Sequence, residues 1–275
     1  MTFQNSGEPS PAMSGLSGLS GIAGGFDPLA ILGSDLKIWH EAAKETAYAD
    51  GETATTAADF SGNGDNSSQV GGVTYETNEI NALPTFRFDG TDDYFGFAAG
   101  ALDLSNNVGC ITVFTIARFD TPTSAAANRW LGVSINSGAT TYRLSLILVE
   151  NTGVYRIGSR RADADANANK SAAVGPSAAT WYIIIAERDY SLQTAKLWEN
   201  GTSTINASGV GTAGNTDATN SNAIRWSSAV GNSPVDGDMP VLLIASSAAA
   251  LGVTKLNQIQ DGLAAKYGLT VVPIT

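Results

Sequence analysis

Alternating apolar and polar positions in the middle of the chain predict β-strands. In residues 83–97, Phe86 and Phe88 alternate with polar residues, and Tyr94, Phe95 and Phe97 follow a polar turn. A period of two is typical of a strand with one buried face, so we expect a β-hairpin here, with three carboxylates at its tip. Further strands are expected to begin at Leu36 and to span 111–119, 130–135, 142–149, 154–159, 181–187, 195–199, 202–205, 224–226 and 239–245.

A helical period is found near the C-terminus. Thr254 can serve as its N-cap and Gly268 as its left-handed end. Gly262 inside it costs about 1 kcal/mol relative to alanine, so the helix is expected to lean on the strands. Its apolar positions share one helix face: Leu256, Ile259, Leu263 and Tyr267. Short strands, turns and one closing helix predict an all-β protein, a two-sheet antiparallel jelly-roll sandwich with one C-terminal helix and an extended N-terminal arm.

Residues 1–34 are expected to be that Gly/Ser-rich arm, and residues 35–275 the jelly-roll domain, with the segment 26–28 marking the entry to the domain. Glycine recurs at every third position of GLSGLSGIAGG, but the run is too short for a collagen helix. The arm is either a flexible linker or a segment that orders when it docks on a partner. We favour docking, with four apolar anchors: Phe3, Leu16, Leu19 and Ile22.

Four segments occur in a familiar order: DFSGNG at 59–64, LPTFRFDGTDDYFGF at 83–97, WENG at 198–201 and LAAKYGL at 263–269. From about residue 35 onward the chain resembles the LamG-like modules of the concanavalin A-like lectin/glucanase group, which often occur in phage and bacterial surface proteins. The resemblance implies a jelly-roll fold and a habit of binding glycans or partners. A fold of this kind does not by itself give a function.

Composition and charge limit the classes of partner that this protein is expected to bind. Charged residues make up 15% of the 275 residues, below the roughly 25% of ordinary soluble domains. The net charge of −11 disfavours nucleic acid and anionic membranes as partners. Neither a secretion signal nor an 18-residue apolar run is present. Because the resembled fold usually works outside cells, release of a virion by lysis reconciles these observations; a cytoplasmic protein or a lost leader remains an alternative.

Few residues could support catalysis. His40 is the only histidine and Cys110 the only cysteine, which is too few for a nucleophilic triad or a zinc site. We expect Cys110 to be a small core residue. Glucanases of the resembled group carry Glu-x-Asp-x-x-Glu on one strand, and the nearest match, Glu187-Arg188-Asp189, lacks the third acid. We interpret that match as a solvated strand end and expect no enzyme activity.

A metal site is the one cofactor that the sequence suggests. Asp59, Asn63 and Asp65 put oxygen ligands around glycines, and Asp89 with its neighbours could add more, a pattern that faintly resembles a calcium loop. The alternative is that Asp59 and Asn63 hold a tight turn by bonding local backbone N–H groups. We favour the turn and keep calcium as a candidate.

Sugar recognition requires aromatic platforms and polar loops on a rigid scaffold. Candidate aromatics are Trp130, Tyr142, Tyr155, Trp198 and Trp226, but each is explained as well by a place in the core, so we nominate no ligand-binding residue.

The sequence therefore predicts a non-enzymatic phage virion structural protein, a capsid decoration, fibre or tail adhesion module assembled in the host cytoplasm. Its arm would bind other virion proteins, its jelly roll would bind host-surface glycans or partners, and it would form a homo-oligomer such as a trimer. The alternatives are a stand-alone lectin-like carbohydrate-binding protein and a glucanase-type glycoside hydrolase.

Overall fold

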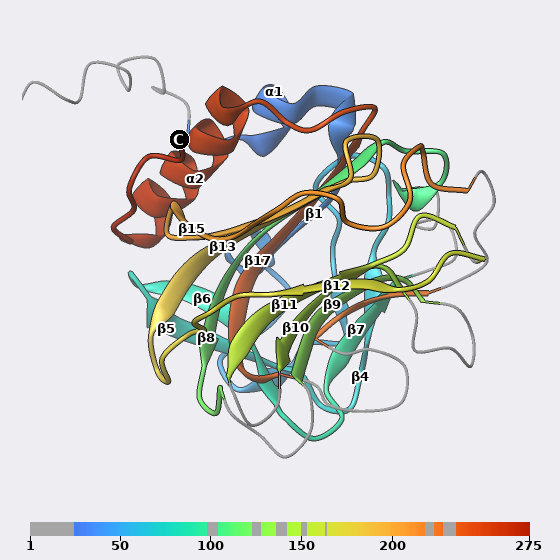
Figure 1. Cartoon of the computed structure of the whole chain (residues 1–275). Helices are drawn as coiled ribbons and strands as arrows, with labels where there is room; N and C mark the ends of the chain where they lie inside the picture. The colour runs from blue at the N-terminus through green and yellow to red at the C-terminus, as the bar shows by residue number, and fades with distance from the viewer. Residues whose placement is uncertain are drawn as a thin grey trace, which may run out of the picture.

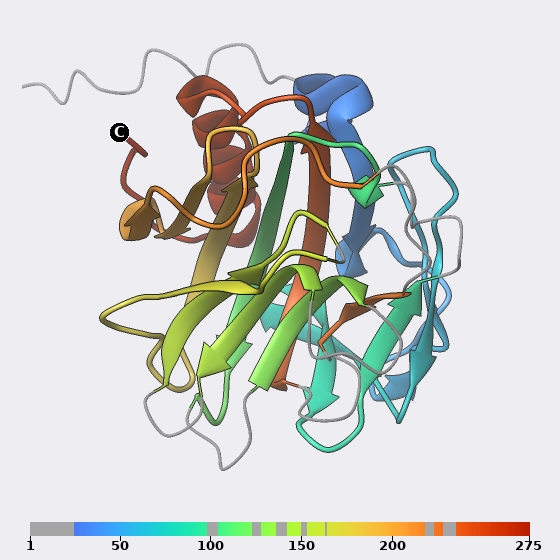
Figure 2. The ribbon, with the colours of Figure 1, turned by 45° about the vertical axis from the view of Figure 1, so that its right-hand side comes forward.

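The computed structural model describes residues 25–97, 104–122, 128–135, 142–149, 153–162, 164–217, 223–227 and 235–275. Two antiparallel β-sheets pack face to face, and a C-terminal helix lies on the outer side of one of them (Figures 1 and 2). The predicted all-β sandwich with a closing helix is confirmed. The arm anchors Phe3, Leu16, Leu19 and Ile22 lie outside the described residues.

Sheet A has the strand order β15-β14-β13-β8-β17-β6-β5-β2, and β1 also pairs with β17. Its strands are β1 (Leu36–Glu41), β2 (Glu52–Thr53), β5 (Thr74–Ile80), β6 (Leu83–Asp89), β8 (Cys110–Phe119), β13 (Trp181–Asp189), β14 (Thr194–Glu199), β15 (Thr202–Ala207) and β17 (Asp236–Ser247).

Sheet B has the order β12-β11-β10-β9-β16-β7-β4-β3. Its strands are β3 (Thr56–Ala57), β4 (Ser67–Val70), β7 (Tyr94–Phe97), β9 (Asn128–Ile135), β10 (Tyr142–Val149), β11 (Val154–Ser159), β12 (Ala168–Ser171) and β16 (Ala223–Trp226). The strands β4, β5 and the edge strand β12 were not predicted from the sequence, because they are polar along much of their length.

The predicted hairpin at 83–97 is wrong. β6 pairs with β5 and β17 in sheet A, whereas β7 pairs with β4 and β16 in sheet B. The turn therefore carries the chain from one sheet to the other, so that the two apolar faces meet across the core. The rings of Phe86 and Phe95 have centroids 5.0 Å apart. Alternation alone could not separate the two arrangements, because both bury one face of each strand.

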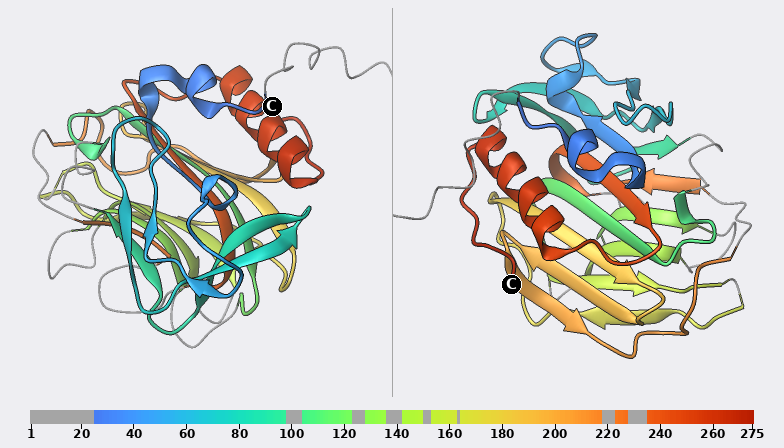
Figure 3. Two further views of the ribbon diagram at one scale, coloured as in Figure 1. Left: turned by 180° about the vertical axis from the view of Figure 1, so that it is seen from behind. Right: turned by 90° about the horizontal axis from the view of Figure 1, so that it is seen from above.

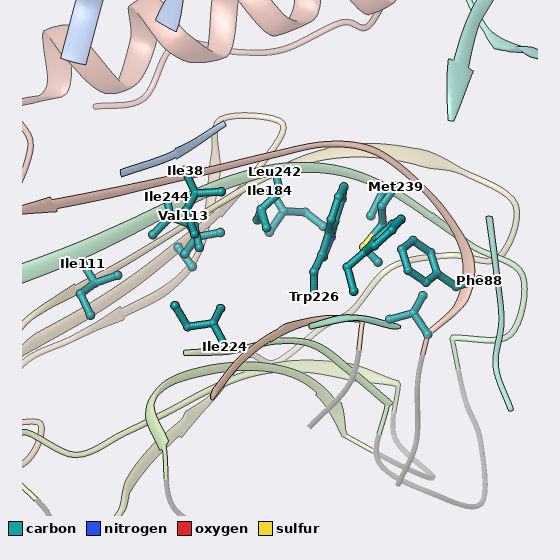
Figure 4. Close-up of a cluster of buried hydrophobic side chains, with 14 of the residues drawn as sticks. Ile38, Phe88, Ile111, Val113, Ile184, Ile224, Trp226, Met239, Leu242 and Ile244 are labelled. Carbon is teal, nitrogen blue, oxygen red and sulfur yellow. The ribbon is translucent and has the colours of Figure 1, made fainter. Parts of the chain in front are cut away.

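The core between the sheets is built around Trp226 of β16. Its ring lies 5.7 Å from those of Phe86 and Phe95 and 5.9 Å from that of Phe88. Figure 4 shows Trp226 beside Met239 and Phe88, with a row of aliphatic side chains extending away from them. Aromatic side chains of this size dominate the free energy of such a core.

The C-terminal helix α2 (Val253–Tyr267) begins two residues earlier than expected, with Gly252 rather than Thr254 as its N-cap. Gly268 ends it in the left-handed conformation (φ 67°), as predicted. The predicted apolar face is buried against sheet A. Gly262 has a packing role, because a Cβ at this position would overlap the ring of Phe26.

The predicted boundary of the arm at residue 34 is also wrong. Asp27 caps a short helix, α1 (Pro28–Leu32), through a 2.9 Å bond from the Leu29 N–H, and the 3₁₀ turn η1 (Gly33–Asp35) follows. Leu32 is buried and Phe26 packs against the same cluster as α2. The folded part thus includes residues 26–34, in agreement with the expected entry at 26–28.

The hairpin predicted around Asn200 and Gly201 is confirmed. It joins β14 and β15, and both turn residues have positive φ, 48° and 83°, as a two-residue turn of this kind requires. The segment 41–56 contains a 3₁₀ turn, η2 (Ala42–Lys44), and the short strand β2. In the described part of the chain, neither helix is long and apolar enough to cross a lipid bilayer.

Candidate functional site

The outer faces of the two sheets differ. Both helices lie on the outer side of sheet A, and the view from above shows α2 crossing over its strands (Figure 3). No described helix lies on the outer side of sheet B (Figures 1 and 2). Because sheet B turns its inner face to the core, its outer face is the broad β surface that the described helices leave uncovered.

Backbone pairing aligns one outward position from each strand into a row across this face. At position 96, for example, the neighbours Phe95 and Phe97 point into the core, so the residue between them faces outward. Apart from one arginine, the members of the row have no side chain or a short one: Ser68, Gly96, Arg225, Gly132, Ser145, Gly158 and Asn169.

Arg225 and Tyr94 form the most distinctive contact on this face. Ile224 and Trp226 are buried in the core, so Arg225 points outward, and its guanidinium carbon lies 4.5 Å from the centre of the Tyr94 ring. Val70 pairs with Tyr94 on the neighbouring strand and is 44% exposed. An aromatic ring, an aliphatic side chain and a cation therefore lie together beside the row of short residues.

A second polar cluster, on the outer face of sheet A, pairs with itself. Arg87 and Arg118 donate to Asp238 at 3.0 and 2.7 Å, and Arg87 also pairs with Asp120. Burial raises the pKa of Asp238 to about 6, in spite of the two arginines. Because the charged groups of this cluster pair with one another, they are less available to a ligand than the guanidinium of Arg225.

The residues of the predicted calcium loop hold a turn. Asp59 accepts the N–H groups of Trp39, Ser61 and Asp65 at 3.0–3.1 Å. Burial alone would raise the pKa of Asp59, but these bonds, with that from the Ser61 hydroxyl, outweigh it and lower the pKa. Asn63 donates to the Lys37 carbonyl at 2.8 Å rather than accepting from an N–H. The turn thus ties residues 59–65 to β1.

Asp89 belongs to a separate group. Its carboxylate lies with those of Asp92 and Asp93, all ligand atoms within 4.8 Å of one another, and neither Asp59 nor Asp65 is part of that group. Asp89 accepts the Thr91 N–H at 2.8 Å, and Asp93 accepts the Asp89 N–H at 3.0 Å. Carboxylates of this kind suit Ca²⁺, yet these bonds also explain them as turn residues, so calcium stays a prediction.

The nearest match to a glucanase motif is not a solvated strand end. Glu187 and Asp189 are buried on the α2 side of sheet A. Glu187 accepts the Leu251 N–H at 3.0 Å, and Asp189 accepts the Ala250 N–H at 3.3 Å. Burial raises the pKa of Glu187. The pair therefore anchors the segment that leads into α2.

Arg188 points to the other side of the strand and is buried between the sheets. Its guanidinium donates to Ser159 Oγ at 2.8 Å and to the Thr194 carbonyl at 2.8 Å. It acts as a cross-link, since these bonds join β13 to sheet B and to β14.

Most other candidates are core residues. Tyr155, Trp198 and Trp226 are buried, as is Cys110, which we predicted to be in the core. The side chains of Trp130 and Tyr142 lie outside the described part. His40 lies within β1 and is buried, with its Nδ1 2.8 Å from the Ala58 carbonyl oxygen.

Sequence reasoning missed Tyr94 and Arg225 as a site. Tyr94 was assigned to a strand and Arg225 lies between two buried residues of a short strand, but nothing in the sequence pairs positions 130 residues apart. The available signal was the glycine at position 96, which leaves an outward strand position without a side chain.

Comparisons with known proteins bear on the fold. No protein-family model matches this sequence, and no curated protein matches it. Domain 4 of AbnA, a GH43 extracellular arabinanase from Geobacillus stearothermophilus solved with arabinotriose, has a TM-score of 0.56 and 12% identity, covering 83% of this chain and 98% of that one.

Two further structures are similar over shorter shares of their length. A botulinum neurotoxin type C structure, described with two ganglioside molecules in cell entry, has a TM-score of 0.59 and 10% identity, covering 86% of this chain and 53% of that one. Trypanosoma rangeli sialidase with sialic acid has a TM-score of 0.56 and 10% identity, covering 86% and 34%. This chain thus spans about half of the neurotoxin chain and a third of the sialidase. It shares the lectin-like β-sandwich fold with domains of these proteins.

Proposed function

We propose that this protein is a glycan-binding module whose ligand lies on the outer face of sheet B. One observation carries the proposal: the contact of 4.5 Å between Arg225 and Tyr94 on a β surface that the described helices leave uncovered. A sugar ring could stack on the aromatic and aliphatic surface of Tyr94 and Val70, while short polar residues in the row bond its hydroxyls.

The structural neighbours support this proposal only as analogy. An arabinanase domain solved with arabinotriose and a sialidase solved with sialic acid share the sandwich. A fold hosts many functions, so the residues on the face, rather than the fold, must be tested.

Our proposal includes no catalysis. The two acids nearest to a glucanase pattern, Glu187 and Asp189, are buried against the segment before α2 instead of facing a ligand across about 5 Å, as retaining glycosidases require. The glucanase-type alternative therefore has no support from these residues. A test is sugar release from an arrayed glycan that is lost in Glu187→Gln; such release would revive it.

We also propose that this module is part of a virion, as a decoration, fibre or tail adhesion protein that is bound to other virion proteins. The supporting observations are the Gly/Ser-rich arm and the position of α1 and of the C-terminus on the α2 side of the molecule, away from sheet B (Figures 1 and 3). A tether on that side leaves the proposed ligand face free, and several copies, such as a trimer, would raise avidity. Mass spectrometry of purified phage particles tests this; absence from every particle would favour the stand-alone lectin.

The test of glycan binding is a glycan array with the full chain and two variants. Tyr94→Ala removes the proposed aromatic platform. We expect glycan binding to become about tenfold weaker, because stacking of a ring on one aromatic side chain contributes on the order of 1–3 kcal/mol. Trp181→Ala is the matched control, since Trp181 is a half-buried aromatic on the outer face of sheet A. Equal losses in both variants, or binding to no glycan, would refute the proposed site.

A further inference from the structure

The acidic residues of this chain are distributed unevenly between its two sheets. The chain contains 26 Asp and Glu against 15 Lys and Arg, yet the strands of sheet B, as described, contain no acidic residue. They contain five basic residues: Arg129, Arg143, Arg156, Lys170 and Arg225. The strands of sheet A also contain five basic residues, but together with ten acidic ones, among them Glu187 and Asp189 of β13 and Asp236 and Asp238 of β17. The face that we propose as a ligand site is therefore built on the basic strands.

Arg225 is the cation best placed to meet a ligand. It is half-buried and pairs with no carboxylate among the described residues, and its guanidinium carbon lies 4.5 Å from the centre of the Tyr94 ring. The residues paired with it on both sides are Gly96 of β7 and Gly132 of β9. Because neither has a side chain, nothing at these two positions covers the guanidinium from the side.

Arg156 lies on the same face. Its neighbours Tyr155 and Ile157 are buried in the core, so the arginine between them faces outward and is half-buried. Two arginines, Arg225 of β16 and Arg156 of β11, thus lie on the same face of sheet B. An arginine fork matches the planar geometry of a carboxylate or a sulfate.

From these observations we infer that the ligand of the sheet B face is an anionic glycan, one whose sugar rings carry carboxylate or sulfate groups. The inference rests on the proposed function, because it names the class of glycan for the same site. The tyrosine supplies the ring contact and Arg225 meets the anionic group. The net charge of −11 opposes every polyanion at long range, nucleic acid included, so a preference for a glycan must come from the ring contact with Tyr94 together with Arg225.

The test measures binding of four probes to the intact protein: dextran as the neutral polysaccharide, polygalacturonate for carboxylates, dextran sulfate for sulfates, and double-stranded DNA as a polyanion without this sugar pattern. We expect at least one acidic polysaccharide to bind more tightly than dextran and DNA. That binding should weaken as sodium chloride is raised, because salt screens exposed charges.

Two charge variants complete the test. Arg225→Gln should weaken acidic-polysaccharide binding about tenfold, the effect of losing one hydrogen bond to a charged group, and Arg225→Lys should recover only part of it. Lys255→Gln is the matched control: it also removes one half-buried cation, but from α2, where Lys255 pairs with Asp35 at 3.3 Å, and should leave binding unchanged.

The outcomes separate the two proposals. If dextran binds as well as the acidic probes, or if Arg225→Gln and Lys255→Gln behave alike, the anionic class is wrong while glycan binding stands. Binding of DNA as tight as that of the acidic polysaccharides would show a general polyanion surface and also overturn the inference. If none of the three polysaccharides and no arrayed glycan binds, both proposals fall.

Discussion

Acid should destabilise this protein through His40. The ring is buried, lies 5.0 Å from that of Phe97 and stacks on Trp226 at 6.1 Å. Its Nδ1 donates to the Ala58 carbonyl, whereas Nε2 is buried and has no hydrogen-bond partner among the described residues. Burial lowers the pKa of His40 from 6.5 to about 4, and neither the bond to Ala58 nor the charge of Asp59 offsets it.

The sign and size of the effect follow from these values. Between pH 6.5 and about 4 the unfolded chain binds a proton at His40 and the folded chain does not. Stability is thus fully present above pH 6.5 and is lost as the pH falls toward 4. The gap between the two pKa values corresponds to about 3 kcal/mol of the free energy of unfolding.

The assay compares the wild type with His40→Asn, whose amide can still donate to Ala58. Urea unfolding is followed at a series of pH values from about 7.5 to about 4. Carboxylates titrate in both proteins, so the difference between the two curves isolates His40. We expect the wild type to lose about 3 kcal/mol more than the variant over this range. Parallel curves, or a His40 pKa near 6.5 by NMR, would refute the reasoning.

Three further predictions concern packing. Glu41 is buried, pairs with Lys266 Nζ at 2.6 Å and accepts Tyr267 Oη at 2.8 Å and Trp39 Nε1 at 3.0 Å. Glu41→Ala should therefore cost about 3–5 kcal/mol in a urea melt. Glu41→Gln should cost less, because it keeps an acceptor and loses only the charge that pairs with Lys266; equal costs would contradict this. Gly262→Ala should destabilise by about 1–3 kcal/mol despite its better helix propensity, because the methyl group displaces Phe26, and adding Phe26→Ala should remove that penalty. Trp226→Ala should cost about 3–5 kcal/mol by thermal unfolding; a smaller loss would mean that the core refills the space.

Much of the fold could be predicted from local patterns. The 11-residue spacing of Leu256 to Tyr267 gave the buried face of α2, and Asn200-Gly201 gave a hairpin, because in both cases neighbouring residues alone determine the structure. The turn at 89–93 could not be assigned in this way. Whether β6 and β7 pair with each other or belong to different sheets depends on partner strands such as β17, which is about 150 residues away.

The same limit applies to the site. The row from Ser68 to Asn169 is defined by strand pairing and not by any contiguous motif, so neither the Arg225–Tyr94 contact nor the basic character of sheet B is evident from the sequence. Conversely, Glu187 resembled a catalytic acid and Asp59 a metal ligand, but both accept hydrogen bonds from backbone N–H groups and hold the backbone in place. A short polar motif predicts a bond to the nearest N–H group as readily as a ligand.

The most direct test of the central claim is an experimental structure of this protein with an oligosaccharide selected from the array. The account predicts the sugar on the outer face of sheet B, with a ring against Tyr94 and a polar group within hydrogen-bonding distance of Arg225. A sugar bound instead on the α2 side of sheet A would contradict it.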